Sequence, residues 1–574
     1  MHNQPISSTF NGMKISAESQ LASLTPALPQ AQSNWLRPNP SHIKVPRKQG
    51  ELLITPTLSN LVASLAAGPP PDSLLSADLR ELSLQARRDV LFAAEALGTV
   101  VGSPPLDISV AARSGEPWVV TGHQVEFYHA GVWAKVVAAD ELARRSNALP
   151  FDLLVDHDVL DEPGLYVPVR HNGELQKRLI EWAEPHLAGQ GLPLEFVAAP
   201  TGQTRRQWLQ RLRSACGLPS DSLDLVLSTL ADSRLTDYVS WLSEARKRLE
   251  TALDIHVNYL RTSQLCRRSG WFGFVALWLQ NARQWAKLYN AAVERYRQLH
   301  GITAPNQPLP PLHGSAEIVE LPFWLYGQGQ RRGRMMAALA GDTIKLLGLT
   351  GEILLPPLTQ LSPLEAGNLL QQQCHQHGLH IRPRALTLTM FVRLLVADVF
   401  IHGIGGALYD QISDDLLAEL FGCGGAYGCV SAAWLLPLQP AAGSATSPSQ
   451  VRWQLHHLRH NPQLTLSAAR SDVARLLQSR QNALAVLQLK PPQSPAGRTD
   501  AITRSARRQA FRQLHQMLDE LATHNSPAIH QLQTQLRMAE LGQKEQAVAH
   551  WREYYFALHQ RSSLAHLVNC IRHS

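Results

Sequence analysis

The chain has 574 residues, 44% hydrophobic and 17% charged, a balance typical of a soluble globular protein rather than a disordered one. The net charge of +7 is spread along the sequence in short groups such as Arg205-Arg206, which argues against direct nucleic-acid binding. No apolar run is long enough to span a bilayer, residues 1–20 lack an apolar signal core, and the 6 cysteines form no disulfide or zinc pattern. These features indicate a cytoplasmic protein of about two to four structural units.

The first 115 residues are predicted to form a leader followed by a helical segment. Residues 1–56 read as a loosely ordered leader that drapes over the body. From Leu74 to Leu97, apolar residues recur three and four positions apart, which predicts a helix.

A strand–helix–strand pattern occupies residues 116–202. The apolar run Trp118-Val119-Val120 predicts a buried strand that ends at Thr121-Gly122-His123-Gln124, before a helix over Gly131–Arg145. A second apolar run, Phe151–Val155, ends at Asp156-His157-Asp158. Because α/β proteins bind ligands at the carboxyl ends of parallel strands, both polar segments are candidate site residues.

The first of these segments is predicted to bind an anion where the helix begins. Gly122 would let the backbone turn sharply, and His123 would hydrogen-bond a phosphate or stabilise a developing charge, with Gln124 as donor and acceptor. The alternative is that His123 and Gln124 only cap the helix. His129 belongs to an incomplete His-x-Gly-His pattern and is a weaker candidate.

The second segment places two carboxylates around an imidazole. Asp156 and Asp158 would bind an amino group or Mg²⁺, and His157 would transfer a proton near neutral pH. The alternative is a turn in which the aspartates satisfy backbone amides.

Residues 203–304 are predicted to form a helical insertion, and residues 305–436 the second half of the core. This half contains predicted strands at Val319–Leu325 and Thr343–Leu347, and Arg331-Arg332-Gly333-Arg334 is expected at a solvated hairpin tip. Cys374-His375-Gln376-His377 has irregular spacing for a metal site, so a solvated helix end is favoured and no metal ligand is assigned.

A third candidate segment follows the apolar run that ends at Ile401. His402, Gly403, Gly405 and Gly406 would allow close approach of a phosphate or carboxylate, although many tight turns look the same. Arg382 offers five donors for an anion; the alternative is a surface salt bridge.

The C-terminal part is predicted to be helical. Residues 437–498 read as a linker with helices, and residues 499–574 as a helical hairpin and tail. The hairpin would turn at Asn525-Ser526-Pro527, with Ser526 as cap and Pro527 at the first helical position. It would pack on the body or on a second subunit.

Together, the three candidate segments resemble the bacillithiol biosynthesis cysteine-adding enzymes, a family of cysteine ligases. That family carries Thr-Gly-Gln-Gln, then Asp-His-Asp, and later Arg-Pro, an apolar strand and Gly-Pro-Gly-Glu. Asp156-His157-Asp158 is a full match, and Asp161-Glu162 echo the acidic residues after it, whereas His123 replaces a Gln and Gly406 replaces the Glu. The resemblance covers roughly Trp118 to Asp410.

The resemblance implies an α/β fold: a Rossmann-like parallel-sheet core with a helical insertion, similar to class I aminoacyl-tRNA synthetases, and a C-terminal helical hairpin. It implies a ligase that joins an amino acid such as cysteine to an amine of a sugar-containing acceptor. A carboxylate is a poor electrophile, so ATP or another nucleotide, with Mg²⁺, is expected. Partners would be small-molecule substrates and a second copy bound through the C-terminal helices. The alternatives are a nucleotidyl-transferring enzyme of the same fold and a non-catalytic nucleotide- or metabolite-binding protein.

Overall fold

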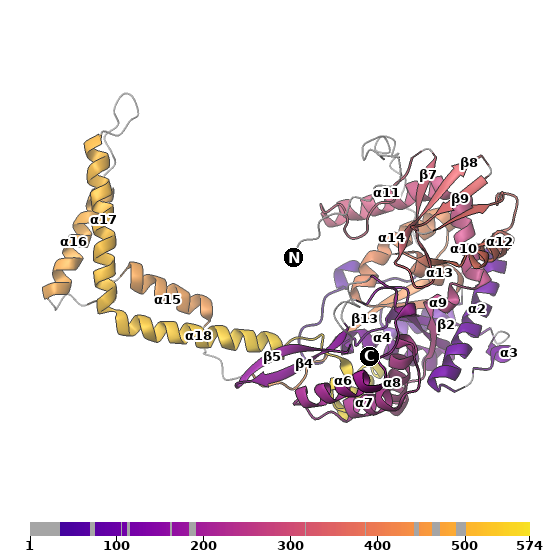
Figure 1. The fold of residues 1–574 in the computed structure, drawn as a ribbon, viewed down its shortest axis with the longest axis horizontal. Coiled ribbons are helices and arrows are strands. Elements are labelled where there is room, and N and C mark those ends of the chain that lie inside the picture. The colour runs from indigo at the N-terminus through magenta and orange to yellow at the C-terminus, as the bar shows by residue number, and fades with distance from the viewer. Residues whose placement is uncertain are drawn as a thin grey trace.

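The computed structural model consists of a body and a helical arm that extends away from it (Figure 1). It describes residues 35–68, 75–104, 106–111, 115–160, 163–182, 191–315, 317–341, 343–349, 351–384, 386–440, 447–461, 466, 471–488 and 501–574, leaving aside the side chains of 109, 110 and 501–503. The predicted leader therefore lies outside the described residues as far as position 34. No helix in these ranges is both long and apolar enough to cross a membrane.

The body is built on a six-stranded sheet in which all strands except β1 are parallel. In sheet order the strands are β1 (Glu51–Thr55), β13 (Ala426–Ala433), β12 (Val399–His402), β2 (Trp118–Gln124), β3 (Leu149–Val155) and β6 (Asn258–Arg261). β1 pairs antiparallel with β13, so the end of the segment predicted as a leader is an edge strand. The prediction of an α/β fold with a parallel-sheet core is confirmed at this level.

Both faces of the sheet are covered, which explains why its strands are apolar without alternation. Successive residues of a strand point to opposite faces, so Val119 belongs to one buried cluster and Val120 to the other. Two helices define these faces: α4 (Ala130–Ser146) contacts β13, β2 and β3, and α2 (Ala77–Val101) contacts β6. α1 (Leu58–Ala66) and α19 (Arg561–Arg572) pack against α4.

A second sheet lies between β6 and β12 in the sequence and is antiparallel throughout. Its order is β10 (Glu352–Leu355), β9 (Thr343–Leu347), β8 (Gly333–Ala340), β7 (Ile318–Gly327) and β11 (Leu379–Pro383). The predicted strands at Val319–Leu325 and Thr343–Leu347 are confirmed, but they do not extend the parallel core. Residues 305–436, which were expected to form the second half of the parallel core, therefore begin with a separate sheet.

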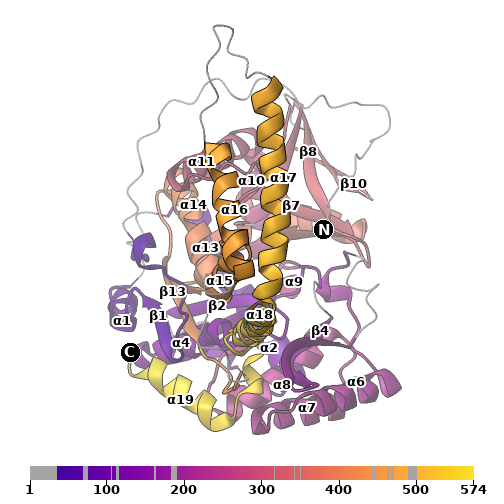
Figure 2. The same ribbon diagram turned by 90° about the vertical axis from the view of Figure 1, so that its left-hand side faces the viewer.

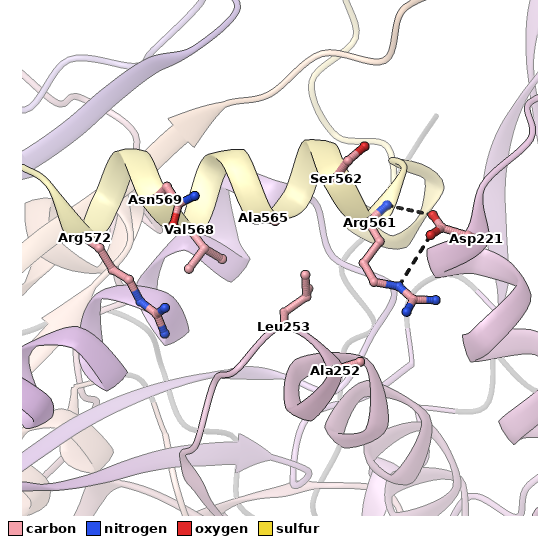
Figure 3. A pocket seen from close by; sticks show the side chains of 9 residues that line it. All are labelled: Asp221, Ala252, Leu253, Arg561, Ser562, Ala565, Val568, Asn569 and Arg572. Atoms are coloured by element: carbon pink, nitrogen blue, oxygen red, sulfur yellow. Dashed lines mark hydrogen bonds and ion pairs between the residues drawn. The ribbon is translucent and has the colours of Figure 1, made fainter.

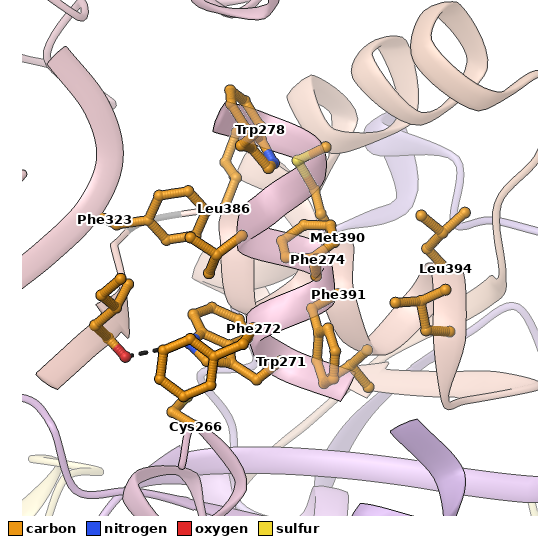
Figure 4. Close-up of a cluster of buried hydrophobic side chains, with 14 of the residues drawn as sticks. Cys266, Trp271, Phe272, Phe274, Trp278, Phe323, Leu386, Met390, Phe391 and Leu394 are labelled. Atoms are coloured by element: carbon orange, nitrogen blue, oxygen red, sulfur yellow. Dashed lines mark hydrogen bonds between the residues drawn. The ribbon is translucent and has the colours of Figure 1, made fainter. Parts of the chain in front are cut away.

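An aromatic core joins this second sheet to its helices. Trp271 and Phe274 of α10 (Ser269–Gln280) pack edge-on against Phe323 of β7 and Phe391 of α13 (Thr387–Leu395) (Figure 4). The neighbouring helices are α11 (Ala282–His300) and α12 (Pro363–Gln376). Burial of each such ring stabilises the fold by roughly 1.5–3 kcal/mol.

The remaining body elements connect these layers. The stretch 203–304, predicted as a helical insertion, contains strand β6 of the parallel sheet among its helices. The other elements are α3 (Ile108–Ala111), β4 (Gly164–His171), β5 (Glu174–Glu181), α6 (Gly202–Ala215), α7 (Asp221–Asp232), α8 (Tyr238–Ala252), α9 (Thr262–Leu265), α14 (Ile404–Phe421) and the short 3-10 helices η1 (Pro40–His42), η3 (Leu194–Phe196) and η5 (Phe556–Leu558).

The arm consists of α15 (Pro448–His460), α16 (Ser471–Gln488), α17 (Ala501–His524) and α18 (Ser526–Ala549). α17 packs beside α16 and α18 beside α15, while α17 and α18 meet at a corner (Figures 1 and 2). The predicted hairpin of α17 and α18 is therefore wrong, because α17 packs mainly on α16 and α18 on α15 instead. Asn525, not Ser526, occupies the cap position of α18.

Candidate functional site at the carboxyl edge of the parallel sheet

The three candidate segments lie at the carboxyl ends of strands that are neighbours in the sheet. β12, β2 and β3 are adjacent and parallel, with Ile401 opposite Thr121 and Gln124 opposite Val155. The Thr121 hydroxyl donates a hydrogen bond of 2.8 Å to the Ile401 carbonyl. Their carboxyl ends therefore lie along the same edge of the sheet.

The first segment is strand rather than turn, which corrects the prediction. β2 continues through Gln124. A Cβ on Gly122 would lie 2.8 Å from the Leu153 Cβ, so glycine at this position allows the close approach of β3. Neither His123 nor Gln124 caps α4, because His129 occupies that position and its Nδ1 accepts a 3.0 Å hydrogen bond from the Gly131 amide.

His123 and Gln124 lie at the end of β2. The His123 ring packs edge-on against Tyr128, with centroids 5.4 Å apart, and 30% of its side chain is exposed. Burial, with the nearby Lys135 charge, lowers the pKa of His123 below its usual range, so the ring is neutral at pH 7. The Gln124 amide donates a hydrogen bond to the Asp158 carboxylate, which joins the ends of β2 and β3.

The two aspartates of the second segment have different environments. Asp156 is fully buried and accepts hydrogen bonds from Arg261 Nε at 2.7 Å and from Ser263 N and Oγ at 2.8 and 2.6 Å. The Asp156 carboxylate is therefore enclosed by protein donors, and it ties the end of β3 to the segment after β6. Asp158 keeps 30% of its side chain exposed.

Asp158 is ionised despite its partial enclosure. Burial alone would raise its pKa, but Arg332, 2.5 Å away, and the hydrogen bonds from Val159 and Gln124 hold the pKa below its usual range. Arg332 lies in the hairpin turn between β7 and β8, as predicted, but its side chain is not simply solvated: the guanidinium contacts Asp158 and lies 4.9 Å above the Trp324 ring. The second sheet thus supplies a residue to the edge of the first.

His157 lies between the two aspartates in the sequence, and its side chain is buried. It is 7% exposed, and its Nδ1 has no hydrogen-bond partner within the described ranges. Burial lowers the pKa of His157 to about 4, so the ring is neutral near pH 7. Asp161 and Glu162 lie outside the described residues.

Arg382 is not available to a ligand. It is fully buried, and its guanidinium pairs with both carboxylate oxygens of Glu195 at 3.0 and 2.8 Å. The Glu195 amide donates to the Asp156 carbonyl at 2.7 Å. Arg382 therefore neither forms a surface salt bridge nor is free to bind an anion. Its ion pair holds Glu195 in place, and Glu195 in turn contacts the backbone of Asp156.

The third segment forms the start of a helix. His402 ends β12, Gly403 caps α14 through its backbone, and Gly405 and Gly406 lie exposed in the first turn. The helix begins at Ile404, so Gly405 and Gly406 belong to the helix rather than to a preceding turn. His402 Nε2 lies 2.8 Å from an Asp410 carboxylate oxygen.

Lys135 connects the first and third segments and was not anticipated. Its ammonium donates a 2.8 Å hydrogen bond to the Gly122 carbonyl, and its side chain lies beside Gly403. Burial lowers the pKa of Lys135 to about 8. A charged residue within the otherwise apolar stretch of α4 from Trp133 to Ala139 was the signal in the sequence.

We define the sheet-edge site as His123, Gln124, Asp158, Arg332, His402 and the first turn of α14. Its exposed glycines and the start of α14, which has no side-chain cap, fit a phosphate group. A Mg²⁺ held by protein carboxylates does not fit, because Asp156 and Asp158 are engaged by arginines. Within the described ranges no three histidine, cysteine, aspartate or glutamate side chains converge as metal ligands.

Two cavities lie away from the sheet-edge site. One, of about 420 Å³, is lined by α19 and the end of α8, with Arg561 and Arg572 on either side of Leu253 (Figure 3). Leu253 precedes β6, so this cavity is at the amino edge of the sheet. The other, of about 290 Å³, is lined by Arg267, Arg268 and Gln371 among others.

No known family model and no curated protein sequence matches this chain. The resemblance to the cysteine-adding enzymes therefore depends on the three segments and their arrangement.

Proposed function

We propose that this protein is a carbon–nitrogen ligase with a Rossmann-like core, which joins an amino acid such as cysteine to an amine of a sugar-containing acceptor. One observation carries the proposal. The segments that resemble the cysteine-adding enzymes are separated by up to 280 residues, yet they lie at the ends of adjacent strands, at one edge of the sheet. A cytoplasmic location and small-molecule substrates accompany this function.

The residues of the sheet-edge site divide into two roles in this proposal. The ionised Asp158, held by Gln124 and Arg332, orients the ammonium group of a substrate by a charge-assisted hydrogen bond. The first-turn amides of α14 hold a phosphate. A nucleotide, when bound, supplies the activation of the carboxylate, and Mg²⁺ would enter with it rather than with protein ligands.

The test is amide formation by the full-length protein, with cysteine and a glucosamine-containing acceptor, followed by mass spectrometry with and without ATP and Mg²⁺. We expect nucleotide-dependent product. Asp158→Asn should reduce turnover about a hundredfold or more, as loss of an essential charge does, whereas Asp415→Asn, a surface change in α14, should not.

The two alternatives predict other outcomes. Pyrophosphate exchange that depends on an amino acid but gives no amide with any amine would favour a nucleotidyl-transferring enzyme. Nucleotide binding without product from any amino acid would favour a non-catalytic binding protein. Full activity of Asp158→Asn would remove Asp158 from the site.

A further inference from the structure

A buried chain of charged groups lies behind His402. One oxygen of Asp410 lies 2.8 Å from His402 Nε2 and 2.6 Å from a guanidinium nitrogen of Arg393. Arg393 also pairs with Asp414 at 2.7 Å, and both residues are almost completely buried. Burial would raise the pKa of Asp410, but Arg393 and His402 hold it well below its usual range.

This arrangement determines which nitrogen of His402 carries the proton. An ionised carboxylate only accepts hydrogen bonds, so Nε2 of His402 must donate to Asp410. In the neutral ring, Nδ1 then keeps its lone pair. Asp410 therefore acts as a positioning residue that fixes the ring and its tautomer, and Arg393 keeps Asp410 charged.

The free nitrogen of His402 faces the first turn of α14. A Cβ on Gly406 would lie 2.7 Å from His402 Nδ1, so the imidazole occupies the space of a side chain at that position. His402 is 5% exposed, and no hydrogen bond to Nδ1 is found among the described residues. Gly405 and Gly406 are exposed, and no side chain caps this helix.

We propose that His402 is the proton acceptor of the sheet-edge site and that the first-turn amides of α14 bind the leaving oxyanion. This inference rests on the proposed function. As the amine nitrogen attacks the activated carboxyl carbon, the C–N bond forms and the bond from that carbon to the phosphate oxygen breaks. Its electron pair leaves on the phosphate, and the amine proton moves to His402 Nδ1. The Asp410 carboxylate stabilises the imidazolium that results.

The first test measures the resting state and needs no ligase activity. In protein labelled with ¹⁵N-histidine, the His402 resonance, assigned by its loss in His402→Gln, should show a protonated Nε2 and an unprotonated Nδ1. Added pyrophosphate should shift this resonance and the amide signals of Gly405 and Gly406. A protonated Nδ1 in the neutral ring, or no response to pyrophosphate, would overturn the proposal even if the protein is a ligase.

The second test measures turnover. His402→Gln should lower kcat by about a hundredfold to ten-thousandfold with little change in KM. Asp410→Asn should also lower kcat and should lose the single tautomer. Gly406→Ala should also lower kcat, because the added methyl group displaces the His402 ring while the backbone amide of residue 406 remains.

Asp415→Asn is the matched control in α14, because Asp415 is partly exposed and, among the described residues, its ion pair is with Arg295. Turnover of His402→Gln within twofold of the wild type would refute the proton-acceptor role while leaving the ligase function in place. Absence of any ligase product would instead refute the proposed function, and the tautomer and pyrophosphate measurements would still decide whether His402 and α14 form the inferred site.

Discussion

The aspartates that flank His157 differ in what surrounds them, and substitution should separate them. Asp156→Asn should lower the free energy of unfolding by about 2–4 kcal/mol, because it removes one of the two carboxylates that pair with the buried Arg261, the other being Asp237. Asp158→Asn should cost less than about 1 kcal/mol, since that side chain is partly exposed. Urea unfolding of both variants tests this difference. Equal stabilities would mean that the buried contacts of Asp156 contribute no more to folding than the partly exposed contacts of Asp158.

Lys135 should make stability depend on pH in the alkaline range. Burial lowers its pKa in the folded protein to about 8, from 10.5. Below pH 8 the lysine is charged in both states. Between pH 8 and 10.5 the folded chain loses the proton while the unfolded chain keeps it, so the free energy of unfolding rises with pH by ~3 kcal/mol.

Lys135→Met should remove this rise, and the wild-type and variant stability curves should converge or cross between pH 8 and 10.5. Unfolding in denaturant at half-unit pH steps measures the difference. Parallel curves across this window would show that Lys135 keeps an ordinary pKa in the folded protein.

At the scale of secondary-structure elements, the C-terminal segment has two parts with different effects on stability. Phe556 stacks on Trp133 of α4 with ring centroids 4.8 Å apart, and α19 buries Leu564, Leu567 and Ile571 in the core of the body. Removing residues 550–574 should therefore unfold or aggregate the protein, since several fully buried apolar side chains are lost at once.

Removing the arm should be tolerated. A variant in which a glycine–serine linker replaces residues 447–549 should retain a cooperative thermal transition within a few degrees of the wild type, measured by circular dichroism. If this variant is unfolded while the one lacking residues 550–574 is folded, the assignment of α19 to the core is wrong.

The apolar runs of the sequence predicted the core strands, because burial on both faces leaves a continuous signal. The end of β2 was missed, since Thr121–Gln124 is polar and becomes strand only by pairing with β3. Arg332 could not be predicted as a site residue because its partner, Asp158, is 174 positions away in the sequence. The prediction of a hairpin between α17 and α18 failed for a related reason: the apolar residues of each helix could pack against several other helices.

At the scale of the whole molecule, we expect the arm to join two copies of the protein. It extends from the body and carries large apolar side chains that remain solvent-exposed, namely Trp453, Phe511 and Met538. Burial of such residues stabilises association. Light scattering after size-exclusion chromatography should give a dimer for the full chain and a monomer for the variant that lacks residues 447–549. A monomeric full chain at micromolar concentration would contradict this expectation.

The order of strands in the parallel sheet also has a consequence for synthesis. β2 pairs with β12, and the Thr121 hydroxyl reaches a carbonyl 280 residues further along the chain. At about 5–20 residues per second, a ribosome needs roughly 14–56 s to supply that partner. During this interval the nascent β2 has one unpaired edge, so a translation stall between β3 and β12 should promote aggregation. The central strand β2 is thus synthesised early, but its second neighbour in the sheet, β12, becomes available only late.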